Sequence, residues 1–114
     1  MGVESLKIVI VSPEFFPLAK TGGLADVSYA LSKALCQLGH TVKVFLPLYQ
    51  SVSKSAAVKD SGVKPVQIRL GEKNLEVGLK VTTLSGHPAE VFLVDCPIFF
   101  DRPELLRDRN TGLA

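Results

Sequence analysis

The feature that most constrains the fold is a pair of short β-like runs near the N-terminus. Residues 6–12 (LKIVIVS) are apolar and β-branched, and the run ends at Pro13. Because this run does not alternate polar and apolar residues, it is typical of a strand covered on both faces, as in a parallel sheet. Residues 41–46 (TVKVFL) form a second predicted strand, which ends at Pro47.

Between these strands the apolar residues follow a helical period. Steps of three and four residues separate Leu24, Val27, Leu31, Leu35 and Leu38, while Asp26, Ser28, Lys33 and Gln37 fill the other face. This spacing predicts an amphipathic helix over about 23–38. Gly39 follows it and can adopt the left-handed conformation that often ends a helix. Strand, helix and strand predict a βαβ unit with parallel strands.

The rest of the chain predicts mostly β-structure. Residues 50–64 show no clear period and predict a loop, with one helical turn around 54–59. Three strand-like segments follow at 66–70, 75–84 and 89–94, separated by turn-forming residues at 71–74 and 85–88. A further helical turn is expected from Pro103. We therefore predict an α/β fold, with a Rossmann-like parallel sheet that starts as βαβ and is extended by antiparallel hairpins.

Composition excludes several classes of protein. A chain of 114 residues with a net charge of +2 predicts one domain, and its scattered basic residues predict no nucleic-acid partner. The apolar runs are too short for a membrane span, and the N-terminus lacks a signal-peptide pattern, so we expect a cytoplasmic protein. Cys36 and Cys96 have no metal-binding or redox spacing, which predicts reduced thiols and no bound metal.

The connection between the first strand and the helix, residues 12–26 (SPEFFPLAKTGGLAD), is the predicted site. Ligands of open α/β sheets bind at the carboxyl ends of the strands, where this loop lies. Gly22 and Gly23 let a phosphate approach the free amides at the positive end of the helix, and Lys20 adds a full charge. The alternative is an ordinary glycine-containing helix start with a solvated lysine.

Other loop residues allow two interpretations each. Asp26 either complements the helix dipole or contacts a ligand, and Glu14 either binds a sugar hydroxyl or braces the loop. Phe15 and Phe16 either form an apolar wall against a ligand ring or pack within the loop. The loop lacks the G-x-G-x-x-G and G-x-x-x-x-G-K-[ST] nucleotide motifs. His87 lies in a Gly-His-Pro sequence, is expected to be solvated, and is not assigned to catalysis.

The run K-T-G-G-L-A-D-V at residues 20–27, just after S-P-E-F-F-P, resembles the N-terminal signature of bacterial glycogen synthases and plant starch synthases. The similarity continues through residues 30–49 and 94–103. It implies a GT-B glycosyltransferase that moves glucose from ADP-glucose to the non-reducing end of an α-1,4-glucan with retention of configuration. Such enzymes have two Rossmann-like domains that face each other across a cleft, and the donor sugar is a substrate, so no cofactor is implied.

Carried onto this chain, the resemblance gives the loop residues their roles. Lys20 would neutralise charge on the departing ADP, backbone donors at Gly22 and Gly23 would hold the diphosphate or the glucose, and Asp26 would contact the sugar or order the loop. Thr21 and Glu14 complete the expected substrate-binding residues. Family members commonly have Gly and Pro where this chain has Tyr29 and Ser32.

The resemblance also bears on domain organisation. Residues 1–114 would be a partial first domain, without the C-terminal nucleotide-binding domain, and would be inactive alone. The protein would be cytoplasmic, or plastidic in a plant. Two alternatives stay open: a stand-alone α/β module that binds a phosphate or nucleotide, and a non-catalytic glucan-binding module.

Overall fold

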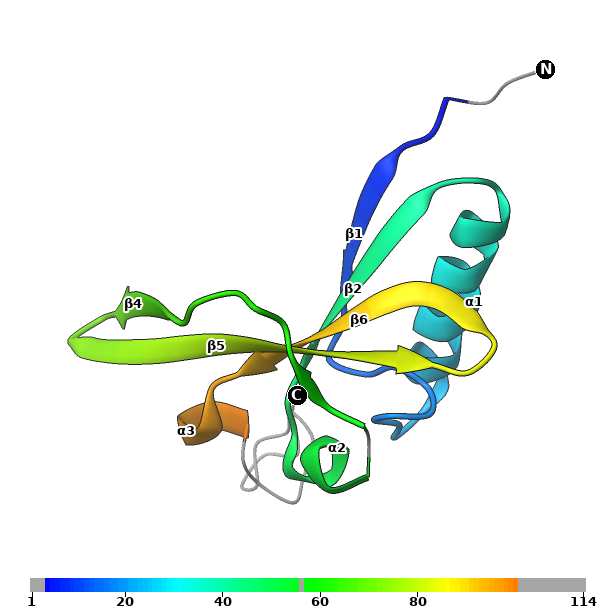
Figure 1. The fold of residues 1–114 in the computed structure, drawn as a ribbon. Coiled ribbons are helices and arrows are strands. Elements are labelled where there is room, and N and C mark those ends of the chain that lie inside the picture. The colour runs from blue at the N-terminus through cyan, green and yellow to red at the C-terminus, as the bar shows by residue number, and fades with distance from the viewer. Residues whose placement is uncertain (1–3, 56, 101–114) are drawn as a thin grey trace.

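A computed structural model describes residues 4–55 and 57–100. Strand β1 (Lys7–Val11), helix α1 (Gly23–Gln37) and strand β2 (Thr41–Pro47) form the βαβ unit that the sequence predicts. β1 and β2 are parallel, with Ile8 opposite Val42. Figure 1 shows α1 lying against one face of these strands.

The remaining elements of the described chain are four strands, which extend the sheet on the other side of β2, and two short helices. They are α2 (Gln50–Ser55), β3 (Lys59–Asp60), β4 (Val66–Leu70), β5 (Lys73–Leu84), β6 (His87–Asp95) and α3 (Pro97–Phe100). The strand order is β1-β2-β6-β5-β3, with β4 paired to β5. β6 runs parallel to β2, whereas β3, β4 and β5 make antiparallel pairs. The predicted α/β fold, a parallel sheet with an antiparallel extension, is confirmed.

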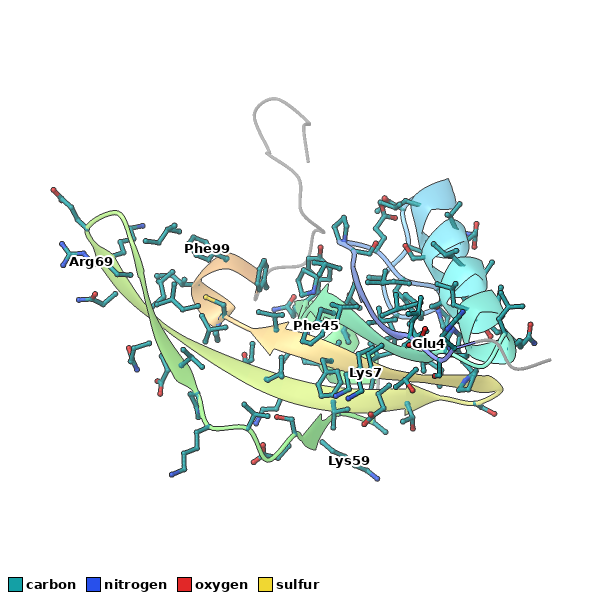
Figure 2. All side chains as sticks on the ribbon, turned by 90° about the horizontal axis from the view of Figure 1, so that it is seen from above. Glu4, Lys7, Phe45, Lys59, Arg69 and Phe99 are labelled. Atoms are coloured by element: carbon teal, nitrogen blue, oxygen red, sulfur yellow. The ribbon has the colours of Figure 1, made fainter. Side chains whose placement is uncertain are left out.

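Strand β4 and the first half of β5 form an arm that leaves the body of the sheet (Figure 1). All five residues of β4 are exposed. In Figure 2, Arg69 lies near the tip of this arm, at the opposite end of the molecule from α1. The arm therefore contributes little to the core. None of the helices in the described part of the chain is long and apolar enough to cross a membrane.

The segment between β2 and β4 differs from the prediction. The helix lies at Gln50–Ser55, before the expected turn at 54–59, and it is followed by the short strand β3. Its position is fixed by Tyr49 and Val52, which are fully buried in the core although most of their neighbours are polar. The helical turn expected at Pro103 lies outside the described residues.

The core lies between α1 and one face of the sheet. Alternate residues of two central strands point into it: Val42, Val44 and Leu46 of β2, and Ala89, Val91 and Leu93 of β6. On the opposite face, Phe45 and Phe92 stack with ring centroids 5.2 Å apart. This face has no long helix over it in the described part of the chain, so the sheet is covered mainly on one side.

The prediction that the first strand is covered on both faces is wrong. Ile8 and Ile10 pack against the core, but Val9 and Val11 are 61% and 79% exposed. The reason is that β1 is an edge strand of the sheet and only its α1 side meets a helix. The continuous apolar run therefore predicted the strand correctly, but it wrongly predicted that both faces of the strand are buried.

Helix α1 buries a different face from the one that its leucines suggest. Leu24, Val27 and Leu31 are 47%, 60% and 50% exposed, and of the five periodic residues only Leu35 packs against the core. The buried residues of the helix are instead the small ones, Ala25, Ser28 and Ser32. Small side chains let the helix backbone approach the sheet closely, and the serine hydroxyls find hydrogen-bond partners there.

Candidate functional site

The loop at residues 12–22 lies at the carboxyl end of β1, as the sequence predicts. Two contacts fix its start: the Ser12 amide donates to the Phe45 carbonyl at 3.0 Å, and the Tyr49 hydroxyl donates to the Pro13 carbonyl at 2.8 Å. Further along, Phe15 and Ala19 exchange two backbone hydrogen bonds of 2.9 Å and close the loop on itself. The loop is therefore held at both its start and its middle.

Glu14 braces the end of this loop. Its Oε1 accepts hydrogen bonds from the Thr21 amide at 2.6 Å, the Thr21 hydroxyl at 2.8 Å and the Gly22 amide at 3.3 Å. The hydrogen bond from the Thr21 amide is the main reason that the pKa of the Glu14 carboxyl is lowered from its ordinary value. The amides of Thr21 and Gly22 are therefore already occupied by a negative charge from within the chain.

Lys20 and Asp26 pair across the beginning of α1. The Lys20 Nζ lies 2.8 and 2.7 Å from the two carboxylate oxygens of Asp26. Asp26 is in the first turn of the helix, where its charge complements the dipole, but it binds Lys20 rather than a backbone amide. The Nζ also lies 5.5 Å from the centroid of the exposed Phe16 ring.

No other part of the described protein covers the space next to the Cα atoms of Gly22 and Gly23. Neither has a positive φ, and Gly22 is extended at φ −167° and ψ −157°. A Cβ added to either glycine would meet no atom within 4 Å. Within the described residues the Gly23 amide donates to no other group. The fold itself thus gives no reason for glycine at these positions, whereas a ligand approaching the backbone would.

The two phenylalanines of the loop have different surroundings. Phe15 is fully buried, with its ring 5.9 Å from Tyr29 and 5.6 Å from His87, so it packs within the fold. Phe16 lies at the surface, edge-on to Tyr29 at 5.5 Å. Only Phe16 is therefore placed to contact a ligand.

The prediction that His87 is solvated is wrong, since it is only 6% exposed. The turn is shorter than expected, and β6 begins at His87 itself. Its Nε2 lies 2.9 Å from the Ser32 Oγ and 3.2 Å from the Tyr29 carbonyl, and its Nδ1 accepts from the Ala89 amide at 3.1 Å. Burial lowers the pKa of His87. Two-residue alternation from Ala89 and Val91 back to His87 was the signal that could have placed it on the buried face.

An open apolar pocket of about 330 Å³ lies at the same end of the sheet. It is lined by Val11, Ser12, Pro13, Phe45, Leu46, Pro47, Val94 and Phe100. Such a lining does not suit a diphosphate, whereas residues 20–26 present the Lys20 ammonium and the Gly23 amide. Cys36 and Cys96 are free thiols, and the described residues contain no cluster of three His, Cys, Asp or Glu that could hold a metal ion.

Residues 7–112 match a family model described as the starch synthase catalytic domain. A glycogen synthase from Marinobacter nauticus is 43% identical over 96 residues, which are 84% of this chain and 19% of that protein. One from Aeromonas hydrophila is 36% identical over 110 residues, which are 96% of this chain and 22% of that protein. The chain thus spans about a fifth of the length of these relatives.

A solved structure shares the fold. The catalytic domain of starch synthase IV from Arabidopsis thaliana, bound to ADP and acarbose, matches with a TM-score of 0.72 and 26% sequence identity. The match covers 96% of this chain and 22% of that one.

Proposed function

The chain belongs to the starch synthase catalytic-domain family, and from this we propose that it forms the first part of a glycogen or starch synthase. The complete protein transfers glucose from ADP-glucose to the non-reducing end of an α-1,4-glucan and retains the anomeric configuration. The glycogen synthases among its relatives support this activity. The ADP and acarbose bound to the similar starch synthase IV support the two substrate classes, a nucleotide sugar and a glucan.

The observation that carries the proposal is the open surface over Gly22 and Gly23 beside the charge of Lys20. The diphosphate of ADP-glucose would compete with Asp26 for the Lys20 ammonium and accept a hydrogen bond from the Gly23 amide. As the glucose–phosphate bond breaks, negative charge grows on the departing ADP. A preorganised donor aimed at such charge is typically worth about 3–4 kcal/mol.

The other loop residues prepare this contact. Glu14 holds Thr21 and Gly22 in place through its hydrogen bonds, and Asp26 holds Lys20 until the diphosphate arrives. The proposed binding residues are Glu14, Lys20, Thr21, Gly22, Gly23 and Asp26. We assign no catalytic group within residues 1–114 and no cofactor, because ADP-glucose is the donor substrate.

The domain organisation is part of the same proposal. Residues 1–114 would belong to the first of two domains, with the remaining nucleotide contacts supplied by the second. The one-fifth coverage of the relatives is consistent with this. The free thiols fit a reducing compartment, the cytoplasm or, in a plant, the plastid.

Glucosyl transfer by the full-length protein tests the proposal. ADP-glucose and a maltooligosaccharide should yield a chain longer by one glucose, with an α-linkage by NMR. UDP-glucose in place of ADP-glucose tests the choice of nucleotide. No transfer, or a β-linked product, would contradict the proposal.

Calorimetry separates the two alternatives. If the protein is a two-domain synthase, residues 1–114 alone should bind ADP-glucose weakly. Micromolar binding of ADP by this chain alone would instead support a stand-alone nucleotide module. Binding of maltooligosaccharides by the full-length protein without any transfer would support a glucan-binding module.

A further inference from the structure

His87 connects three parts of the molecule that are distant in sequence. It begins β6, its Nε2 reaches Ser32 and Tyr29 of α1, and its ring meets Phe15 of the site loop. Figure 1 shows the turn between β5 and β6 lying beside α1. The buried ring is therefore the point where the sheet, the helix and the loop meet.

The hydrogen bonds determine which nitrogen carries the proton. The Ala89 amide can only donate, so Nδ1 must accept and carries no hydrogen. Nε2–H then donates toward the Tyr29 carbonyl and the Ser32 Oγ, while the Ser32 hydroxyl donates to the Ser28 carbonyl at 2.7 Å. Every polar atom of the neutral ring has a partner.

The ring is linked to the site loop through aromatic packing. His87 is edge-on to Phe15 at 5.6 Å and to Tyr29 at 4.7 Å. Phe15 follows Glu14 directly, and Glu14 holds the Thr21 and Gly22 amides. A displacement of the His87 ring would therefore shift Phe15 and, with it, the carboxylate that orders the end of the loop.

We propose that His87 is a positioning residue for the donor site: its neutral ring holds Phe15 and α1 so that Glu14 orders Thr21 and Gly22 for the nucleotide sugar. The part about the nucleotide sugar rests on the proposed function. His87 does not touch the substrate itself, so its effect reaches the site only through Phe15 and Glu14.

Protonation of His87 should release this arrangement. A proton on Nδ1 would face the Ala89 amide hydrogen, and both groups would then be donors. Among the groups around the ring, the Tyr29 carbonyl favours its positive charge, whereas the Lys33 ammonium of α1 opposes it. The loop and β5 present Phe15 and Leu84, which carry no charge, and burial outweighs the carbonyl contact. Acidification should therefore loosen the loop.

The direction of the pH effect follows from burial. The pKa of His87 is lowered below its ordinary value of 6.5, mainly by desolvation. The neutral ring's contribution to stability is then complete above pH 6.5 and is lost as the pH falls through the lowered pKa.

NMR on residues 1–114 tests the linkage without any assay of transfer. The Thr21 amide resonance reports the Glu14 contact, and the His87 ring resonances report its protonation. We expect the Thr21 amide to shift with the midpoint of the His87 titration, in addition to any shift that follows Glu14, and Glu14→Gln distinguishes the two. A Thr21 resonance that is unchanged while His87 titrates would overturn the proposal, whether or not the complete protein proves to be a synthase.

Kinetics of the full-length protein test the positioning role. We expect the wild-type KM for ADP-glucose to rise as the pH falls through the lowered pKa of His87. His87→Asn keeps an acceptor near the Nδ1 position and does not titrate, so it should remove this increase. His87→Leu should raise this KM at pH 7.5 by about tenfold, the effect of 1.4 kcal/mol. If His87→Leu lowered the yield of folded enzyme but left the KM of the folded fraction unchanged, the positioning role of His87 would be contradicted.

His40 offers a matched control. Its Nδ1 also accepts a backbone hydrogen bond, from the Leu6 amide at 3.1 Å, but it lies at the amino end of β2, away from the loop. His40→Asn should leave the pH dependence of KM as in the wild type. The same loss of pH dependence in His40→Asn would contradict the assignment to His87.

Discussion

The ammonium of Lys20 contacts both carboxylate oxygens of Asp26, at 2.8 and 2.7 Å, although the two side chains remain 43% and 53% exposed. An ion pair that exposed typically stabilises a protein by about 0–1 kcal/mol. Opening the pair therefore costs little. Asp26 orients Lys20 at the beginning of α1 and can be displaced by a more highly charged anion such as a diphosphate.

Gly23→Ala should separate folding from function. The new methyl group meets no atom within 4 Å and Gly23 has no positive φ, so stability should stay the same or rise by about 0.4–1 kcal/mol. In the full-length protein the methyl group would cover the surface proposed for the diphosphate and lower kcat/KM for ADP-glucose. Urea unfolding and steady-state kinetics provide the two measurements.

Gly39→Ala is the control for this substitution. Gly39 has φ +98°, a conformation that costs an alanine about 1–2 kcal/mol, and it lies at the other end of α1. It should lower stability and leave kcat/KM of the folded enzyme unchanged. A Gly23→Ala enzyme with normal kinetics would argue against close approach of the donor.

Glu14 should titrate below the ordinary glutamate value of 4.5, because ionisation is favoured by the Thr21 amide. Its hydrogen bonds stabilise the loop above that value, and this stabilisation is lost as the pH falls through the lowered pKa. In an acid titration the Thr21 amide resonance should show, besides the shift expected with His87, a shift that follows this midpoint, and Glu14→Gln should abolish that second shift. A midpoint at or above 4.5 for the Glu14 carboxyl itself would show that the contact is absent in solution.

The burial of α1 predicts opposite outcomes for two neighbouring substitutions. Ser32 is fully buried, so Ser32→Leu should overpack the interface with the sheet and cost about 1–3 kcal/mol. Leu31 is half exposed, so Leu31→Ser should change stability by no more than about 0.5 kcal/mol. Urea unfolding of residues 1–114 measures both. A larger loss for Leu31→Ser would mean that the helix is rotated from the position described.

Periodicity in the sequence was sufficient to predict the βαβ unit, the hairpins and the position of the site loop. It was not sufficient for the orientation of α1, because a helical repeat does not say which face meets the sheet. Small residues such as Ala25 and Ser28 allow the closer approach, and the leucine face is left exposed.

The sequence predicted the position of the loop residues better than it predicted their interactions. The loop residues Lys20, Gly22 and Gly23 lie together at the carboxyl end of β1. The interactions depend on the path of the loop, and no periodic pattern in the sequence predicts that path. They are the ion pair of Lys20 with Asp26 and the hydrogen bonds of Glu14 with the Thr21 and Gly22 amides.

The central claim is that Lys20 acts on the donor, and glucosyl transfer by the Lys20→Ala variant of the full-length protein tests it most directly. Lys59→Ala, which removes an exposed lysine on β3, is the matched control. We predict that Lys20→Ala lowers kcat for transfer from ADP-glucose to maltooligosaccharide by about tenfold or more, with an unchanged melting temperature, while Lys59→Ala behaves as the wild type. Equal kcat for Lys20→Ala and the wild type would contradict the account.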